Sequence, residues 1–112
     1  MAAKFEIKES ANQQFMFNLK AANGEVILTS ETYRQKRSAE QGIASVKANA
    51  GDDSRFERRT AKDGSPYFVL KAANGEIIGK SEMYSSVAAM EKGIASVVTN
   101  AAAAEIVDTV AA

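Results

Sequence analysis

The chain has 112 residues, of which 46% are hydrophobic and 25% are charged, and these values fit one globular domain with a hydrophobic core. Fourteen basic and fourteen acidic residues cancel, and because sequence-independent nucleic-acid binding normally depends on a basic excess, the composition disfavours nucleic acid as a partner. The sequence contains no Cys and no His, which excludes disulfides, thiolate nucleophiles, Cys/His zinc sites and imidazole acid–base catalysis.

Neither end of the chain has the pattern of a membrane segment. Charged residues at 6–9 leave no room for an apolar signal-peptide core after Met1. The most apolar tract, residues 97–112, is interrupted by Glu105 and Asp108 and is therefore unsuited to span a bilayer. We expect a cytoplasmic protein that does not associate with membranes.

Residues 4–50 predict three short strands followed by a helix. Segments 5–8 and 15–20 alternate apolar and polar side chains, which is the pattern of strands with one buried face. Asn23-Gly24 is the dipeptide that type I′ turns prefer, and it leads into a third strand at 26–28. After Tyr33 the apolar residues take helical spacing, at Ala39, Ile43, Val46 and Ala50.

Residues 55–101 repeat this order, so the chain contains two tandem copies of one unit. The hexapeptide 20–25 recurs unchanged as 71–76, and Gly42-Ile-Ala-Ser-Val46 recurs from Gly93, both 51 positions later. The same offset aligns, without a gap, Phe5 with Phe56, Phe17 with Phe68, Leu19 with Leu70, Ile27 with Ile78, Tyr33 with Tyr84 and Asn49 with Asn100. The second unit therefore predicts the same elements, with Asp63-Gly64 turning its first hairpin and Ser85 or Ser86 capping its helix.

A glycine lies on the apolar face of each predicted helix, Gly42 in the first and Gly93 in the second. Each costs about 1 kcal/mol relative to Ala. Tolerating this cost twice suggests a close approach to the sheet or to the other helix, although an inherited glycine without a special role is the alternative.

The C-terminal segment 102–112 has two interpretations. Residues 105–110 are rich in β-branched side chains interleaved with charge, and the repeat offset places Val107 in register with Phe5 and Phe56. The segment could be a swapped strand that adds to the shared sheet beside the first unit and covers a sheet edge. The alternative is a frayed chain end.

The pattern Lys-Ala-x-Asn-Gly-Glu, followed by Tyr and after eight residues by Gly-Ile-x-Ser-Val, resembles the YegP-like family of small bacterial proteins of unknown function. The resemblance covers nearly the whole chain in both copies. It implies β(3)-α-β units that share one sheet and exchange their C-terminal strands, and it implies that a two-copy chain is a monomeric pseudo-dimer. It implies no activity. One departure is that Arg58 stands where the first unit has Ile7, which makes the first strand of the second copy less apolar.

A basic patch is the candidate nucleic-acid contact, formed by Arg34, Lys36, Arg37, Arg55, Arg58 and Arg59. Phe56 would supply an aromatic neighbour to these cations. The alternative is a solvated charged surface, which the nearby Asp52, Asp53 and Glu57 favour. In the second unit, the positions equivalent to 34–37 are 85–88, and they carry no charge. The patch is therefore not duplicated, and nucleic acid stays the disfavoured partner.

Tyr33 and Tyr84 stand where the strand pattern changes to the helical one. They could line a pocket between the two units, or each could plug one end of the core. Four glutamates recur in pairs, and carboxylates can serve acid–base or divalent-metal chemistry where they converge in a cleft: Glu25 with Glu76, and Glu31 with Glu82. Because Glu25 and Glu76 directly follow tight turns, we expect them to point into water.

The sequence therefore predicts an α+β fold in one domain, residues 1–112, with repeats at about 4–50 and 55–101. Each repeat is of the ββα type, β-β-β-α, and a further strand could follow at the C-terminus. The two repeats should form one mainly antiparallel sheet with two helices on one face and pseudo-two-fold symmetry. We predict no catalytic residue, metal site or cofactor. The leading function is a non-enzymatic binding module of unidentified partner, and the alternatives are a small enzyme using Glu, Lys or Tyr and a weak nucleic-acid binder.

Overall fold

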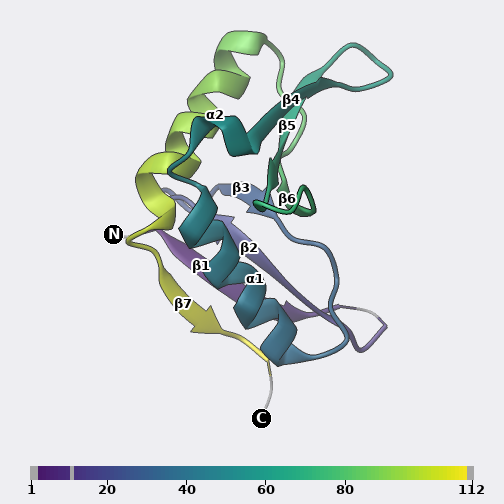
Figure 1. Ribbon diagram of the computed structural model, residues 1–112, viewed down its shortest axis with the longest axis vertical. Coiled ribbons are helices and arrows are strands. Elements are labelled where there is room, and N and C mark those ends of the chain that lie inside the picture. The colour runs from purple at the N-terminus through teal and green to yellow at the C-terminus, as the bar shows by residue number, and fades with distance from the viewer. Residues whose placement is uncertain (1–2, 11, 111–112) are drawn as a thin grey trace.

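The structure is a computed structural model that describes residues 3–10 and 12–110. Its elements are β1 (Lys4–Glu9), β2 (Phe15–Lys20), β3 (Val26–Thr29), α1 (Lys36–Asn49), the 3₁₀ turn η1 (Asp53–Arg55), β4 (Phe56–Thr60), β5 (Pro66–Lys71), β6 (Ile77–Lys80), α2 (Val87–Ala101) and β7 (Glu105–Asp108) (Figure 1). The predicted α+β class and the repeated order of elements are confirmed.

The strands form one sheet in the order β4-β5-β6-β3-β2-β1-β7. Every neighbouring pair is antiparallel except β1 and β7, which are parallel. The two units meet where β3 pairs with β6, through Thr29 and Lys80. Since β4, β5 and β6 lie on one side of this junction and their equivalents β1, β2 and β3 lie on the other, the pseudo-two-fold axis passes here.

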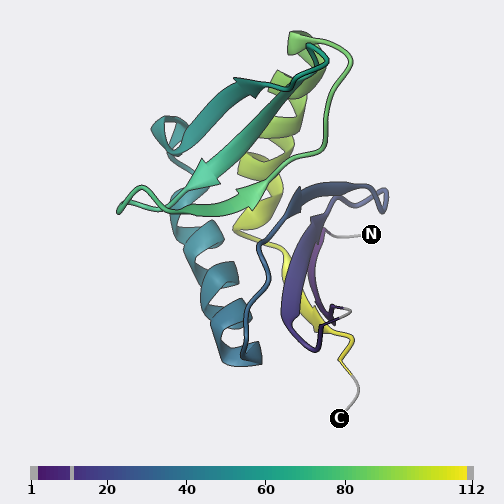
Figure 2. The same cartoon turned by 90° about the vertical axis from the view of Figure 1, so that its right-hand side faces the viewer.

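Both helices pack on the same face of the sheet and form one core with it. Phe5, Phe17 and Leu19 from the first unit and Phe68 and Leu70 from the second are all fully buried in a single cluster with the helix residues. Each helix contacts strands of both units, α1 reaching β2 and β6 and α2 reaching β5 and β3. In Figure 2, α1 lies beside the strands of the first unit and α2 lies behind those of the second unit. The two copies therefore share one hydrophobic core.

The hairpin turns have a different geometry from the one predicted. Gly24, Gly64 and Gly75 have φ of +87°, +90° and +88°, but among the described non-glycine residues only Gln13 has a positive φ. A type I′ turn needs a positive φ at both of its central residues, so the prediction of type I′ turns is wrong. Instead, the Gly24 N–H donates to the Ala21 carbonyl (2.9 Å) and closes a four-residue turn. Gly24, the last residue of this turn, has a left-handed backbone conformation, and the register between β2 and β3 shifts next to the turn. This is a type I turn with a glycine bulge.

The helix glycines face close neighbours of two kinds, the tyrosine before each helix and a phenylalanine of the sheet. A Cβ added at Gly42 would lie 3.0 Å from Phe17 of β2, and one at Gly93 would lie 3.3 Å from Phe68 of β5. A Cβ added at Gly93 would lie 2.2 Å from the Tyr84 hydroxyl, and one at Gly42 would lie 2.6 Å from that of Tyr33. Each tyrosine ring also stacks on a core phenylalanine, with ring centroids 6.5 Å apart for Tyr33 and Phe17. Each tyrosine therefore fills the space between its helix and the core, at the helix glycine.

The C-terminal strand β7 lies beside β1 and covers one edge of the sheet. Thr109 continues the contact, since its N–H and its hydroxyl both donate to the carbonyl of Ile7, at 2.9 and 2.6 Å. The side chain of Ile106 is 50% exposed, so β7 contributes backbone pairing and cover more than buried side chains. No helix within residues 3–10 and 12–110 has the length and apolarity needed to cross a membrane.

Candidate binding site on the open face of the sheet

The strand register determines which side chains lie on the sheet face that the helices leave uncovered, called the open face below. Side chains alternate between the two faces, so the neighbours of the core residues point to the open face. One row across this face contains Glu57, Val69, Lys80, Thr29, Asn18 and Glu6. The row crosses both units and passes over the β3–β6 junction.

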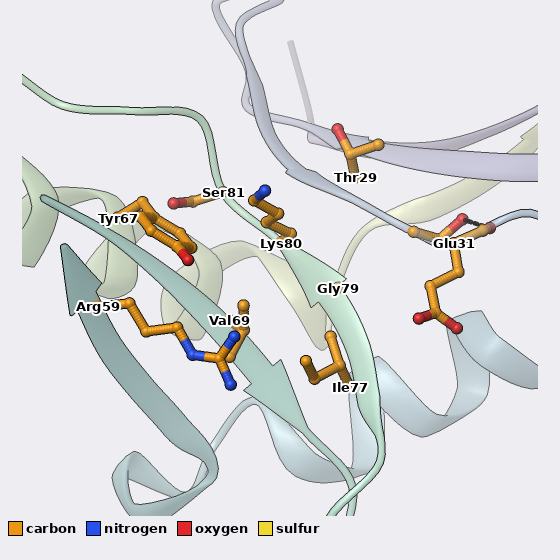
Figure 3. A pocket seen from close by; sticks show the side chains of 10 residues that line it. Thr29, Glu31, Arg59, Tyr67, Val69, Ile77, Gly79, Lys80 and Ser81 are labelled. Atoms are coloured by element: carbon orange, nitrogen blue, oxygen red, sulfur yellow. Dashed lines mark hydrogen bonds between the residues drawn. The ribbon is translucent and has the colours of Figure 1, made fainter. Parts of the chain in front are cut away.

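A pocket of about 360 Å³ opens on this face beside the junction (Figure 3). Most of its lining comes from the second unit, on β4, β5 and β6, and the remainder comes from the end of β3: Arg59, Tyr67, Val69, Ile77, Gly79, Lys80, Ser81, Thr29, Ser30 and Glu31. Val69 is only 1% exposed although it lies outside the main core, because the longer side chains around it cover it. The volume is in the range of small-molecule sites.

The pocket combines an apolar wall with two cations, Arg59 and Lys80, and one carboxylate, Glu31. Tyr67, Val69 and Ile77 form the wall, and the Lys80 ammonium lies 5.1 Å from the centroid of the Tyr67 ring. A cation–π contact at an exposed site is worth about 0.5–1 kcal/mol, so a ligand could displace the ammonium from the ring at small cost. The Arg59 guanidinium binds Glu57, which raises the pKa of Arg59 and lowers that of Glu57, and both groups stay charged at neutral pH.

The two serines of the pocket have structural duties. Ser81 Oγ accepts a hydrogen bond from the Phe68 N–H (2.9 Å) and donates one to the Glu82 carbonyl (2.8 Å), and Ser30 makes the equivalent pair in the first unit. These bonds fix the end of β3 to β2 in the first unit and the end of β6 to β5 in the second. The pocket groups left to contact a ligand are the Tyr67 ring, Lys80, the Glu31 carboxylate and Arg59, which also binds Glu57.

Sequence reasoning missed this pocket, although the differences between the repeats indicate it. On the open face Tyr67 stands where the first unit has Met16, and Val69 stands where it has Asn18. In the first unit the Asn18 amide instead donates to Thr29 Oγ1 (2.9 Å). Positions at which an otherwise close duplication diverges were the available signal.

A second group of cations lies at the other end of the open face. Glu6 sits among Lys4, Lys8 and Lys20, with N–O distances of 3.9, 3.6 and 3.1 Å, and we call these three lysines the lysine cluster. The hydrogen bond from Lys20 lowers the pKa of Glu6, outweighing the opposing effect of burial, and the charges of the three lysines lower it further. Glu57 repeats this arrangement with Arg59 and Lys71.

Glu6 should make the stability of the domain depend on acid pH. Because its pKa is lowered in the folded protein, its contribution is present above the usual value of 4.5 and is lost as the pH falls through the folded pKa. We expect Glu6→Gln to lower the free energy of unfolding at pH 7 by up to about 1 kcal/mol and to converge with the original chain at low pH. Urea midpoints across pH test this, and an undiminished gap at low pH would contradict it.

The structure does not gather the six basic residues of the predicted patch. Arg34, Lys36 and Arg37 stand at the start of α1, whereas the other three follow its end, about 21 Å away for a helix of 14 residues. Lys36 pairs with Asp108 of β7, and Arg55 pairs with Asp52 (3.6 Å). Only Arg59 among the six lines the pocket.

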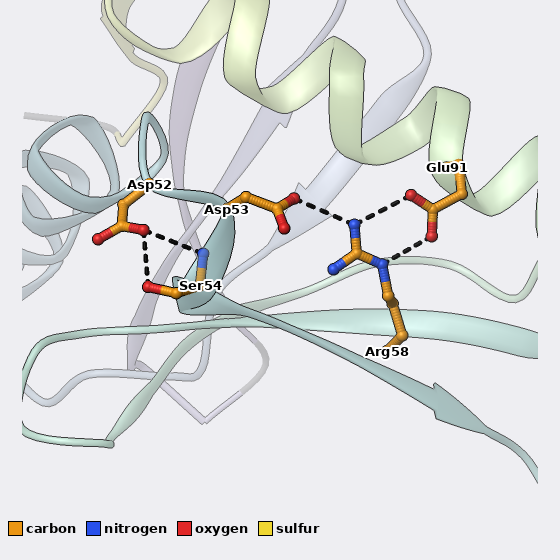
Figure 4. Close-up of polar contacts among 5 residues, drawn as sticks. All are labelled: Asp52, Asp53, Ser54, Arg58 and Glu91. Carbon is orange, nitrogen blue, oxygen red and sulfur yellow. Dashed lines mark hydrogen bonds and ion pairs between the residues drawn. The ribbon is translucent and has the colours of Figure 1, made fainter.

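Arg58 and its ion pairs explain why the second unit departs from the first at this position. Its guanidinium donates to both oxygens of Glu91 on α2 (2.6 and 2.9 Å) and to Asp53 (3.1 Å) (Figure 4). Ile7, its counterpart, is fully buried beside β7, whereas β4 is an edge strand. A charge on the inner face of an edge strand discourages further strand pairing.

Tyr33 and Tyr84 do not line this pocket. Burial raises the pKa of each hydroxyl, and glutamates of both units add to the effect, Glu31 and Glu76 near Tyr33, and Glu82 and Glu25 near Tyr84. Both tyrosines are therefore neutral at physiological pH. Within the part of the chain that the structure describes, no group of three or more acidic residues is placed to hold a metal ion.

Comparisons with known proteins agree with the duplication. The model of a family described as a domain of unknown function, DUF1508, matches residues 10–57 and 61–108. A UPF0339 protein of Mannheimia succiniciproducens is 57% identical over 104 residues, 93% of this chain and 92% of its own. The UPF0339 protein YegP of Escherichia coli is 52% identical over 108 residues, 96% of this chain and 98% of its own.

Two solved structures share the fold of this chain. The solution structure of E. coli yegP, described as a protein of unknown function, has a TM-score of 0.94 at 50% identity, covering 100% of this chain and 97% of that one. That of a UPF0339 protein from Shewanella oneidensis has a TM-score of 0.92 at 50% identity, covering 98% and 93%.

Proposed function

Since the chain belongs to the UPF0339 family, built from the DUF1508 domain of unknown function, we propose a role from its own geometry: it is a non-enzymatic binding module. Its open-face pocket holds an anionic ligand that has a flat or apolar portion. The observation that carries the proposal is the placement of Arg59 and Lys80 beside the wall of Tyr67 and Val69. We also propose that the protein is a monomer and that it acts in the cytoplasm.

The ligand class follows from the lining. Two cations at one site favour an anion, and an arginine can bind phosphate or carboxylate oxygens through two parallel hydrogen bonds. The tyrosine ring and the aliphatic side chains favour a planar or apolar group next to the anion. Binding without catalysis is supported by the sequence, which has no His or Cys, and by the two pocket serines, whose hydroxyls are engaged with the backbone.

A titration with three small probes tests the proposal. Adenosine 5′-monophosphate should bind more tightly than inorganic phosphate, which lacks the ring, and more tightly than adenosine, which lacks the charge. Amide NMR shifts should change at Tyr67, Val69 and Lys80. Absence of shifts at these residues with all three probes at millimolar concentration would refute the proposal.

Lys80→Gln should weaken adenosine monophosphate binding by about ten- to a hundredfold, because it removes one charge-assisted hydrogen bond worth about 1.5–3 kcal/mol. Lys92→Gln on the exposed face of α2 is the matched control and should leave the dissociation constant unchanged. Equal effects of the two substitutions would mean that the charge of the whole protein, and not the pocket, determines binding.

A further inference from the structure

The balanced net charge of the chain conceals a separation of charge between the faces of the fold. On the open face the strands carry six basic side chains, Lys4, Lys8, Lys20, Arg59, Lys71 and Lys80. They carry three carboxylates there, Glu6, Glu57 and Glu105, the last placed by its register with Lys4. Glu31 stands at the rim of the pocket, and its counterpart Glu82 follows β6. The strand surface itself is therefore positive although the protein is neutral overall.

The cations form two groups that one small ligand cannot reach together. The pocket lies on β4, β5 and β6, and the lysine cluster lies on β1 and β2. Strands β5 and β1 are four places apart in the sheet, which is about 19 Å at the usual strand spacing. Asn18 and Thr29, which are uncharged and hydrogen-bonded to each other, lie between the groups. A ligand that used both groups would have to be an extended polyanion.

We propose that this ligand is single-stranded nucleic acid, with one base in the pocket against Tyr67 and the backbone running across the sheet to the lysine cluster. The inference rests on the proposed function, because it extends the same pocket to a longer ligand. Single strands are bound by positive surfaces with an aromatic ring on which a base stacks, whatever its identity. A duplex is the poorer fit, because its bases are paired and its grooves are read by an inserted helix or β-ribbon.

The inference predicts that affinity depends on ligand length. A mononucleotide fills the pocket alone, whereas an oligonucleotide of about twelve residues, within the usual site sizes for single strands, also reaches the lysine cluster. Labelled oligothymidylate and oligouridylate of this length, measured by fluorescence anisotropy, distinguish DNA from RNA as the preferred strand. We expect at least one of them to bind at least tenfold more tightly than adenosine monophosphate, and a duplex of equal length to bind less tightly than that strand.

Two charge-matched triple variants locate the binding surface. Replacing Lys4, Lys8 and Lys20 by Gln should weaken oligonucleotide binding at least tenfold and leave adenosine monophosphate binding intact, which also shows that the variant is folded. Replacing Arg34, Arg37 and Lys92 by Gln removes the same charge elsewhere and should have little effect. The salt dependence supplies a second readout. At a slope of about −0.7 per neutralised phosphate, the lysine-cluster variant should lower the magnitude of the logarithmic slope by about two.

Separate outcomes would overturn the inference and the proposed function. If adenosine monophosphate binds but neither oligonucleotide binds more tightly, the single-strand inference fails and the pocket stands. Equal losses in the two triple variants would also overturn it, because the attraction would then be nonspecific. If Tyr67→Ala leaves the affinity for both the mononucleotide and the oligonucleotide unchanged, the pocket is not the site and the proposed function fails as well.

Discussion

Replacing Leu28 with Ala should destabilise the domain by about 2–5 kcal/mol, the usual range for a fully buried leucine, and the loss should be partly reversed by a second change at Gly79. Leu28 and Gly79 are equivalent positions of the two repeats, 51 residues apart. They face each other across the pseudo-two-fold axis, since a Cβ added at Gly79 would lie 2.6 Å from Leu28 Cδ2 and 2.7 Å from Cγ. Because Gly79 of the second unit has no side chain, Leu28 of the first unit can occupy this space.

The physical reason for the expected reversal is that both side chains compete for one volume. Gly79→Leu alone should cost about 1–3 kcal/mol, because it overpacks the space that Leu28 fills. In the chain that carries both changes, the new leucine enters the cavity from the other unit. Residues in contact couple by up to about 3 kcal/mol, so the double variant should be more stable than the two single losses added together predict.

Urea denaturation of the original chain, both single variants and the double variant measures this coupling. Ile7→Ala combined with Gly79→Leu is the matched control, because Ile7 is also fully buried but lies on β1, away from the junction. That pair should be additive within about 0.5 kcal/mol. Additive losses for the pair Leu28 and Gly79 as well would show that the two units do not pack against each other at this point.

The local elements could be predicted because their causes are local. The alternation at 15–20, the helical spacing around Ile43 and the turn glycines each depend on nearby residues, and they appear as β2, α1 and the hairpin turns. Ser86 caps α2 through the Ala89 N–H (3.1 Å), as one of the two predicted caps, whereas Gln35 makes no side-chain cap at the start of α1. The turn conformation was missed because Asn-Gly suits both a type I′ turn and a type I turn with a glycine bulge.

The binding site could not be predicted because it depends on how the two units meet. The pocket exists only where β6 of one unit pairs with β3 of the other, a contact between Thr29 and Lys80 that no hydrophobic pattern specifies. The net charge of the chain did not indicate the positive charge of the open face, for a similar reason. Alternation along β1 places Lys4, Glu6 and Lys8 on one face, so charge is separated by face, whereas counting along the chain averages it away.

Deleting residues 105–112 should cost about 3 kcal/mol and should also make the chain self-associate. The expected loss comes from the backbone ladder that joins β7 to β1, with hydrogen bonds worth about 1 kcal/mol each, and from the partly buried Val110. The ion pair between Lys36 and Asp108 is exposed and adds little. Ile106→Thr is the control, because it keeps the strand and changes a half-exposed side chain, so its urea midpoint should stay nearly unchanged. An unchanged midpoint after the deletion would mean that β7 does not stabilise the sheet.

Self-association is expected because the two sheet edges are protected in different ways. At β4 the inward-facing Arg58 binds Glu91 of α2, whereas at β1 the equivalent position is Ile7 and β7 provides the cover. Without β7 the chain would present an open strand edge backed by an apolar residue, which pairs readily with another chain. Adding Ile7→Arg to the truncated chain copies the protection of β4, with Glu40 of α1 at the position that Glu91 has in α2. Sedimentation velocity should show concentration-dependent dimers for the truncated chain and monomers once Arg replaces Ile7. Association that persists unchanged in that variant would show that the edge of β1 is not the contact.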